Sequence, residues 1–326
     1  MQKISIAYMS TFGYQASHEQ FAPSQLIKLS KLAEEAGFTS INASDHFHPW
    51  SERQGQAGYA YSWLGAALQA TAIPCGAVTA PGQRQHPAIV AQAAATLAEM
   101  FPKRFWMALG SGEALNEKIT GQQWPSKSIR NERLLECFHI IKRLLNGETV
   151  SHYGHVTIED AKLYTFPKHQ PLLLGAALTN TTAEWMGGWA EGLLTGHKPI
   201  QELMQIIDAF KKGGGEGKPV YLQVQLGYGA DEEKLAADVF NQWRTNIFPG
   251  KVKGDLWKVE HFDALGEFVT IEDIKKKILV SSNIQQHIDS LKEYAALGFE
   301  KIILHNVSRN QEEFINVFGE KVLPKL

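Results

Sequence analysis

The chain has 326 residues, 44% of them hydrophobic and 20% charged, which is ordinary globular composition and enough chain for one large core or two modest ones. Lys and Arg number 32 against 34 Asp and Glu, and this net charge of −2 excludes a basic nucleic-acid-binding protein and an acidic disordered tail. A small-molecule substrate is the expected partner, with no nucleic acid.

The first residues, Met1–Tyr8, alternate like a short strand and lack the longer apolar stretch of a signal peptide. No run approaches the roughly 20 apolar residues of a membrane span. Cys75 and Cys137 lie far apart, so they indicate neither a disulfide framework nor a zinc site. We therefore expect a cytoplasmic protein with no membrane partner.

Short β-rich runs alternate along the chain with segments whose apolar residues recur at helical spacing. Strands are expected at Lys3–Met9, Thr39–Ser44, Ile73–Ala80, Arg104–Gly110, Leu172–Ala177, Gly192–Gly196, Val220–Tyr228 and Lys301–His305. Helices are expected at Ser24–Ala36, Tyr61–Ala70, Pro87–Met100, Asn131–Leu145, Thr182–Ala190, Ile200–Phe210, Asp231–Trp243 and Ile284–Ala296. This alternation predicts an α/β fold with a parallel sheet buried on both faces.

Eight such units favour a closed (β/α)8 TIM barrel over an open sheet of five or six strands. No linker-like stretch divides the sequence, so residues 1–326 are expected to form a single domain. A minimal barrel takes about 250 residues, which leaves a surplus for insertions. We place these at about 150–168, a hairpin turning at Gly154, and at about 246–281.

In such a barrel the active residues come from the carboxyl ends of the strands and from the loops that follow. The second strand runs into Asp45 and His46. A histidine beside a carboxylate can be a general base whose tautomer the acid fixes. A hydrogen-bonded histidine that only orders the loop explains the pair equally well.

His46 and His48 also have the His-x-His spacing of metal-dependent hydrolase barrels. Such a site needs further ligands, and although His197 and His305 end later strands, the last strand brings no Asp to complete the set. We expect no metal, and keep a metal-dependent hydrolase as the alternative from another class.

The fourth strand runs into Gly110-Ser111-Gly112-Glu113, where small residues let the backbone approach a planar ring or a phosphate at a helix N-terminus. The alternative is a plain strand-to-helix turn in which Glu113 favours the helix dipole.

Polar residues follow the fifth and sixth strands as well. Thr179, Thr181 and Thr182 can cap the helix after the fifth strand or donate hydroxyls to a phosphate. Lys198 and Lys276 can bind an anionic substrate, although most lysines are merely solvated. Trp50 and Trp124 lie beside loops of the barrel mouth.

Three stretches, Phe12–Phe21, Ser44–Trp50 and Gly110–Glu117, resemble the F-420-dependent glucose-6-phosphate dehydrogenase branch of the luciferase-like oxidoreductases. The likeness extends through His86–Gln92 and Ile271–Lys276 and covers most of the chain. It implies a luciferase-like (β/α)8-barrel flavoprotein that binds a flavin or deazaflavin at the carboxyl-end mouth of the barrel.

The resemblance also implies roles for residues. His46 matches the base that takes a proton from the substrate hydroxyl, and we expect Asp45 to hold it. Glu113 matches the residue that donates a proton to the reduced deazaflavin. The residues expected to contact the substrate are Trp50, Lys198 and Lys276, the two lysines through a phosphate.

The residues expected to contact the cofactor come from four strand ends: Asp45, Ala77, Val78, Gly110, Ser111, Gly112, Asn116, Ala176, Ala177, Leu178 and Thr179. The family carries a non-proline cis peptide at the end of the third strand, which here would fall between Ala77 and Val78.

The fifth strand departs from the family pattern. Where the family shows Ala-Ala-Gly-Gly-Pro against the cofactor phosphate, this chain has Gly175-Ala176-Ala177-Leu178-Thr179. Side chains stand where bare backbone is expected, so we favour FMN as the cofactor over coenzyme F-420.

Together these readings predict an oxidoreductase that transfers hydride between its cofactor and a small hydroxylated or carbonyl substrate, such as a sugar phosphate. An FMN-dependent monooxygenase that uses oxygen is the alternative in the same fold. A flavin-binding protein without catalysis stays open. We expect a homodimer, and we expect His46 and Glu113 to converge on opposite sides of a shared cavity that holds the ring.

Overall fold

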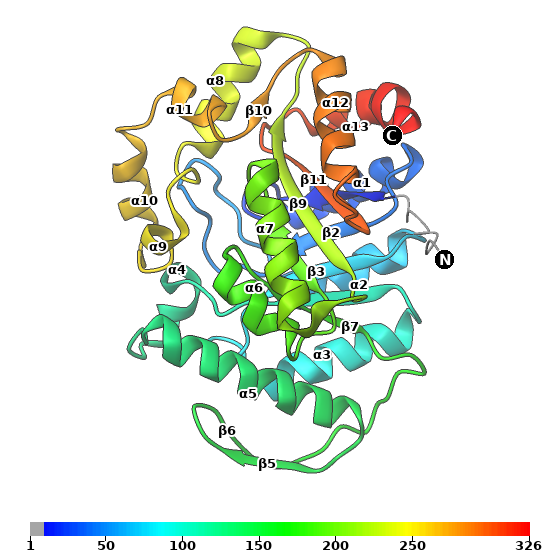
Figure 1. Cartoon of the computed structure of the whole chain (residues 1–326), viewed down its shortest axis with the longest axis vertical. Helices are drawn as coiled ribbons and strands as arrows, with labels where there is room; N and C mark the ends of the chain where they lie inside the picture. The colour runs from blue at the N-terminus through cyan, green and yellow to red at the C-terminus, as the bar shows by residue number, and fades with distance from the viewer. Residues whose placement is uncertain (1–9) are drawn as a thin grey trace.

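Eight parallel strands close into a barrel in the computed structural model, which describes residues 10–326 (Figure 1). The barrel strands are β1 (Thr11–Ala16), β2 (Ile41–Ser44), β3 (Cys75–Thr79), β4 (Phe105–Leu109), β7 (Leu172–Ala176), β8 (Leu193–Gly196), β9 (Val220–Gly227) and β11 (Lys301–Asn306). β1 pairs with both β2 and β11, and the β8–β9 pairing completes the ring. The predicted (β/α)8 barrel is confirmed.

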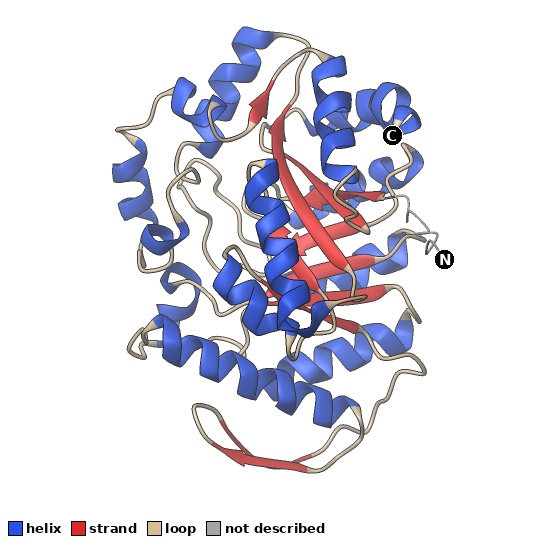
Figure 2. Cartoon of the chain, viewed as in Figure 1, coloured by secondary structure: helices blue, strands red, loops and turns tan. Residues whose placement is uncertain are grey.

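Helices follow the strands and cover the outside of the barrel, as the colouring by secondary structure shows (Figure 2). Those of the barrel repeat are α1 (Pro23–Glu35), α2 (Ala60–Ala70), α3 (Pro87–Met100), α5 (Lys127–Leu145), α6 (Asn180–Gly187), α7 (Ile200–Phe210), α8 (Glu232–Trp243), α12 (Ile284–Ala295) and α13 (Gln311–Val317). Proline opens α1 and α3, where its missing N–H costs no helical hydrogen bond.

The first strand differs from the sequence prediction. Lys3–Met9, where it was expected, lies outside the described residues, and the barrel strand is Thr11–Ala16. Gly13 and Gln15 interrupt the apolar pattern of this strand, the first because of a close approach to Ser40 and the second because its side chain forms hydrogen bonds. A Cβ at Gly13 would overlap Ser40, and the Gln15 side chain hydrogen-bonds inside the barrel to Asn42 and Gln223.

Two further elements interrupt the repeat. The region 150–168 contains an antiparallel hairpin of β5 (Val150–Tyr153) and β6 (Thr157–Ala161), which lies beyond α5 at the bottom of Figure 1. The region 246–281 contains short helices and a two-residue strand that extends the sheet beside β9. These are α9 (Gly250–Lys253), α10 (Val259–Gly266), α11 (Ile271–Lys275) and β10 (Leu279–Val280).

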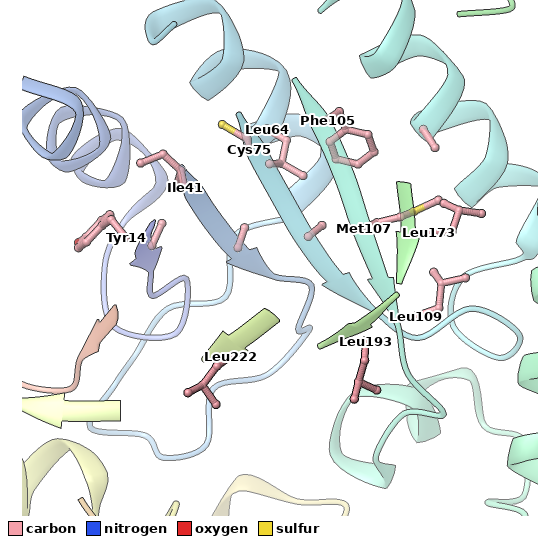
Figure 3. Packing of buried hydrophobic residues seen from close by; sticks show 14 of the residues in the cluster. Tyr14, Ile41, Leu64, Cys75, Phe105, Met107, Leu109, Leu173, Leu193 and Leu222 are labelled. Atoms are coloured by element: carbon pink, nitrogen blue, oxygen red, sulfur yellow. The ribbon is translucent and has the colours of Figure 1, made fainter. Parts of the chain in front are cut away.

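The strands bury both faces. Phe105, Met107 and Leu109 of β4 pack with the helices, and Figure 3 shows Phe105 near Leu64 of α2 and Leu109 at the other end of the strand. The alternate residues belong to an inner cluster made of strand residues alone. At its base the Trp106 indole lies over Gly76, whose missing side chain makes room for it. The inner cluster plugs the barrel, so the functional face is its mouth.

No helix among residues 10–326 combines the length and the hydropathy that crossing a bilayer requires.

Candidate active site

Three loops at the carboxyl ends of β1, β2 and β4 bring Glu19, His46 and Glu113 into contact. His46 Nδ1 lies 2.5 Å from Glu19 Oε1, and His46 Nε2 lies 3.2 Å from Glu113 Oε1. The short helix α4 (Ala114–Glu117) begins directly after Glu113. The predicted convergence of His46 and Glu113 is present, although the two side chains touch directly instead of flanking a ring.

Both carboxylates stabilise the charged form of His46. Burial alone would lower the pKa of His46, but the hydrogen bonds and charges of Glu113 and Glu19 outweigh it and raise the pKa to about 10. Burial would likewise raise the pKa of Glu19, yet its hydrogen bond and charge interaction with His46 hold that pKa at about 2. The pKa of Glu113 is also lowered: burial opposes the change, and the hydrogen bond to His46 is the main cause.

Asp45 does not hold His46, contrary to the sequence prediction. Its buried carboxylate accepts hydrogen bonds from Thr79 Oγ1 at 2.8 Å, Gln85 Nε2 at 3.0 Å and Arg84 Nη2 at 3.0 Å. These donors come from β3 and the loop after it, and they draw the carboxylate toward their side of the barrel. Glu19 orients the imidazole in its place.

Arg84 joins Asp45 to a second buried carboxylate, Glu117 of α4. The Arg84 backbone N–H donates to Glu117 Oε2 at 2.8 Å, and its side-chain Nε lies 3.4 Å from Glu117 Oε1. Burial raises the pKa of Glu117 to about 7, although the hydrogen bond and charge of Arg84 act in the opposite direction. The network fixes α4, and with it Glu113, relative to the loop of His46.

Asn116 ties the same two loops together. Its Oδ1 accepts from the backbone N–H groups of Phe47 at 2.8 Å and His48 at 3.0 Å, and its Nδ2 donates to Glu113 Oε1 at 3.1 Å. His48 Nδ1 donates to the Leu115 carbonyl at 2.9 Å. His48 therefore braces the loop, and residues 10–326 contain no cluster of three or more His, Cys, Asp or Glu side chains arranged to hold a metal ion.

Trp50 closes the site on the side of the 246–281 region. Its ring meets the His46 ring edge-on at 5.2 Å between centroids and packs against Phe262 of α10 at 5.3 Å. Asp263 of the same helix accepts from Ser51 Oγ at 2.6 Å and pairs with Arg53 Nη2 at 2.6 Å. The insertion therefore clamps the loop that follows His46.

Small residues surround the mouth at the level of these side chains. Val78 and Ala176 pack against the inner cluster but are only half-buried, Gly196 ends β8, and Gly110 follows β4 directly. A Cβ at Gly196 would approach Leu178 Cδ2 to 3.0 Å. Glycine and alanine at these positions let a flat ring system approach the backbone, with Leu178 lying beside Gly196.

Two of the residues expected to contact the cofactor face the surrounding helices and not the inside of the barrel. Ala77 and Ala177 are buried in the outer cluster, on the helix side of their strands. Every peptide bond within residues 10–326 is trans, so the cis bond expected between Ala77 and Val78 is absent. Ala77 and Val78 pair in regular parallel register with β2 on one side and with β4 on the other, so β3 has no bulge at this position.

The turn after β4 depends on glycine. Gly112 has φ of 75°, and a Cβ there would lie 2.8 Å from Glu117 Cγ and 3.2 Å from Ala80 Cβ. Ser111 Oγ accepts from Lys127 Nζ at 2.5 Å. After β7, Thr179 caps α6 by accepting from the Thr182 backbone N–H.

The two lysines proposed for a substrate phosphate bind carboxylates about one helical turn away in the sequence. Lys198 Nζ contacts Glu202 at 2.9 Å, and Lys276 Nζ contacts Asp273 at 3.2 Å. The Lys276 side chain is 72% exposed. Lys253 lies beside the candidate site: its Nζ is 5.6 Å from the centre of the Trp50 ring, which contacts His46.

The sequence patterns predict no role for Glu19, and they offer His305 only as a metal ligand that lacks partners. With β1 placed at Thr11–Ala16, the strand-end rule itself would have selected Glu19, which stands three residues beyond that strand. His305 is buried at the end of β11, edge-on to Trp243 at 5.0 Å, and burial lowers its pKa to about 4. The pKa values of His46 and His305 are therefore shifted in opposite directions.

The fold and the site together define a (β/α)8-barrel enzyme with acid–base groups at the carboxyl-end mouth. Residues 3–301 match the family model described as luciferase-like monooxygenase. The F-420-dependent glucose-6-phosphate dehydrogenase of Microbacterium testaceum is 34% identical over 327 residues, covering 97% of this chain and 97% of that protein. The enzyme of the same name from Mycobacterium avium is 30% identical, covering 96% of this chain and 97% of that protein.

Among solved structures, an F-420-dependent secondary alcohol dehydrogenase in complex with an F-420–acetone adduct superposes with a TM-score of 0.91 at 28% identity. The match covers 97% of this chain and 99% of that one. An EDTA monooxygenase from Chelativorans sp. BNC1 shares the fold, with a TM-score of 0.73 at 10% identity. The chain belongs to the luciferase-like family, and it is an oxidoreductase.

Proposed function

We propose that this protein is an F-420-dependent oxidoreductase that transfers hydride between the deazaflavin and a small alcohol or carbonyl compound. The observation that carries the proposal is the Glu19–His46–Glu113 arrangement at the mouth of the barrel. Hydride transfer to or from a carbon that bears oxygen requires a proton to move at that oxygen, and a buried imidazole between two carboxylates is suited to that task.

The chain's contribution is binding, orientation and proton transfer, because the redox chemistry belongs to the cofactor. When bound, the deazaflavin supplies the ring carbon that exchanges hydride. Val78, Gly110, Ala176 and Gly196 would lie against the ring. His46 would exchange a proton at the substrate oxygen while Glu19 fixes the orientation of its imidazole.

Glu113 and Trp50 flank the histidine on its other sides. Glu113 lies at His46 Nε2, where it can hold or pass a proton between the histidine and the bound ring. The Trp50 ring lies edge-on to the His46 ring and covers that side of it, and such apolar surroundings strengthen the electrostatic interactions inside the site.

The relatives support F-420 over the FMN favoured by the sequence analysis, because the similar curated proteins are named for F-420. Leu178 and Thr179 still replace the small residues expected beside the cofactor phosphate. Titrating the protein with F-420 and with FMN, followed by absorption, compares the two affinities, because oxidised F-420 absorbs at shorter wavelength than oxidised FMN. Tighter binding of FMN than of F-420 would contradict the proposal.

The relatives are named for two substrate classes, glucose 6-phosphate and a secondary alcohol, and the contacts of the two lysines distinguish between them. A sugar phosphate would need Lys198 and Lys276 to leave their helix carboxylates, whereas a small secondary alcohol or ketone needs neither. We propose the second class, and assays with 2-propanol, acetone and glucose 6-phosphate compare the two. Turnover of the sugar phosphate alone would reject this choice.

Replacement of His46 by Ala tests the assignment of the site. Turnover of F-420 with the active substrate should fall by about 10²–10⁴-fold, the span of lost general acid–base catalysis, while F-420 affinity stays nearly unchanged. His139→Ala, an exposed histidine on α5, is the matched control. Unchanged turnover in His46→Ala would reject the role, and oxygen-dependent turnover with release of hydrogen peroxide would favour a monooxygenase instead.

A further inference from the structure

The uppermost layer of side chains inside the barrel differs between its two halves. Along each strand, alternate residues face the surrounding helices and the interior, so the residue two positions beyond an inward-facing one faces inward again. In β3, β4, β7 and β8 this layer consists of apolar residues and glycines: Val78, Gly110, Ala176 and Gly196. This half of the mouth is the one proposed to lie against the deazaflavin ring.

The other half of the layer is polar. Tyr221 of β9 and Ile303 of β11 face inward, since both belong to the inner cluster. By the same alternation Gln225 and His305 face inward further along these strands. The two residues are paired in register between β9 and β11. The carboxyl-end mouth therefore has an amide and an imidazole opposite the apolar half.

His305 is buried at this mouth without a hydrogen bond. The residue is only 6% exposed, and its Nε2 is a buried atom with no partner among residues 10–326. The Trp243 ring covers one side of the imidazole edge-on at 5.0 Å between centroids. A buried polar atom without a partner destabilises a folded chain, so its presence beside a candidate active site indicates a ligand that completes its hydrogen bonding.

Gln225 offers a second polar group next to His305. The residue is half-buried, and its backbone carbonyl accepts from His197 Nδ1 at 3.1 Å, which leaves its amide for other contacts. Burial lowers the pKa of His305 to about 4 against the charge of Glu19, so its imidazole is neutral near pH 7. A neutral imidazole and an amide can each donate and accept a hydrogen bond, which suits a hydroxyl or a carbonyl oxygen.

This pair lies beside the group proposed to act on the substrate. β1 pairs with β11 on one side and with β2 on the other, so His305 and His46 come from the two strands that flank β1. Glu19 follows β1 and lies between them: it contacts His46 at 2.5 Å, and its charge acts on His305. Two strand spacings amount to about 10 Å, and side chains that point toward the barrel axis approach each other more closely. A small molecule with oxygens on neighbouring carbons can span this gap.

We propose that His305 and Gln225 form a subsite for a second oxygen of the substrate, so that the substrate is a small hydroxyketone or diol and not a plain ketone or alcohol. The proposal rests on the proposed function and narrows its substrate class. The hydride moves at the carbon that lies near His46, and the second oxygen serves only for recognition.

The first experiment compares acetone with hydroxyacetone, which adds one hydroxyl on the neighbouring carbon, both with reduced F-420. His305→Leu removes the hydrogen-bonding nitrogens at a similar side-chain volume. Relative to wild type, the kcat/KM ratio of hydroxyacetone to acetone should fall by about tenfold, a change in which the intrinsic reactivities of the two ketones cancel. The loss should appear in KM for hydroxyacetone, with kcat nearly unchanged. An unchanged ratio would overturn the proposal.

His305→Gln tests whether hydrogen bonding is the cause. Glutamine also donates and accepts, so this variant should recover a large part of the preference for hydroxyacetone that His305→Leu loses. A ratio as low as that of the leucine variant would overturn the assignment of a hydrogen-bonding subsite.

The second experiment needs no substrate and distinguishes the subsite from a structural role. Since His305→Leu removes a buried nitrogen without a partner, its Tm should equal or exceed that of wild type. His287→Leu is the matched control, because the buried His287 of α12 donates from Nε2 to the Ser281 carbonyl at 2.9 Å. The control should lose stability and keep the wild-type ratio of the two ketones. A fall in Tm of His305→Leu as large as that of the control would overturn the proposal.

The affinity for F-420 separates a substrate contact from a cofactor contact. Absorption titration of His305→Leu should give the wild-type Kd, because the ring is proposed to lie on the apolar half of the mouth. A weaker Kd would assign His305 to the cofactor and overturn the proposal. Acetone turnover with a ratio that His305→Leu leaves unchanged would reject this inference alone. No hydride transfer to any ketone or alcohol would reject the proposed function, and this inference with it.

Discussion

Glu117→Gln should remove a loss of stability that the wild-type protein shows as the pH rises. The Glu117 side chain is 2% exposed, and burial raises its pKa from 4.5 to about 7. Between these two values the folded chain keeps a proton that the unfolded chain has released. The stability linked to this proton is complete below pH 4.5 and is lost as the pH rises through about 7.

The size of the effect follows from the same values. A rise in pKa from 4.5 to about 7 corresponds to about 3 kcal/mol at 1.36 kcal/mol per pKa unit. Glutamine keeps a carbonyl oxygen that can accept from the Arg84 backbone N–H, and it does not titrate. The free energy of unfolding of the variant relative to wild type should therefore increase by about 3 kcal/mol between about pH 4.5 and pH 8.

Urea unfolding at several pH values in this range measures the difference, and the subtraction cancels the other titrating groups. Glu99→Gln, which removes an exposed carboxylate of α3, serves as the control, and its difference from wild type should show no change of this size. A Glu117→Gln curve parallel to that of wild type would refute the reasoning, because Glu117 would then titrate alike in the folded and the unfolded chain.

Two further variants test the packing of the site. Phe262→Ala removes a fully buried ring that supports Trp50. Urea unfolding should show a loss of about 3–5 kcal/mol in the free energy of unfolding, and turnover should fall as well. Full turnover would mean that Trp50 needs no support from α10. Gly112→Ala places a Cβ on a residue with φ of 75°, 2.8 Å from Glu117 Cγ. The free energy of unfolding should fall by at least about 1–2 kcal/mol, and Glu113 should shift. Wild-type stability and kinetics would contradict the need for glycine at this position.

The sequence predicts the barrel well because its signal is local. Strands such as Phe105–Leu109 bury both faces and read as unbroken apolar runs between helical patterns. The rule that active residues follow strand ends then selects His46 and Glu113, and the structure brings these two side chains together.

The same rule missed Glu19 for an identifiable reason. Gly13 and Gln15 make the first barrel strand look irregular, because one avoids Ser40 and the other forms hydrogen bonds inside the barrel. The more regular alternation at Lys3–Met9 is therefore the predicted strand, and the loop that carries Glu19 does not follow a predicted strand end.

The partner of Asp45 depends on packing that the sequence does not express. Arg84 lies 39 positions away and reaches Asp45 only because the loop after β3 folds back across the mouth. The same holds for Phe262 against Trp50, since the 246–281 region has no periodic pattern that places it over the loop of His46.

Deuterium tracing of the hydride tests the account most directly. The enzyme is incubated with oxidised F-420 and 2-propanol carrying deuterium on its second carbon, at about pH 9, where more neutral His46 is present, and the reduced F-420 is weighed by mass spectrometry. We expect one deuterium gained for each F-420 reduced, with reduced F-420 forming far more slowly in His46→Ala. Reduced F-420 that carries no label, or labelled product formed equally fast without the imidazole, would contradict it.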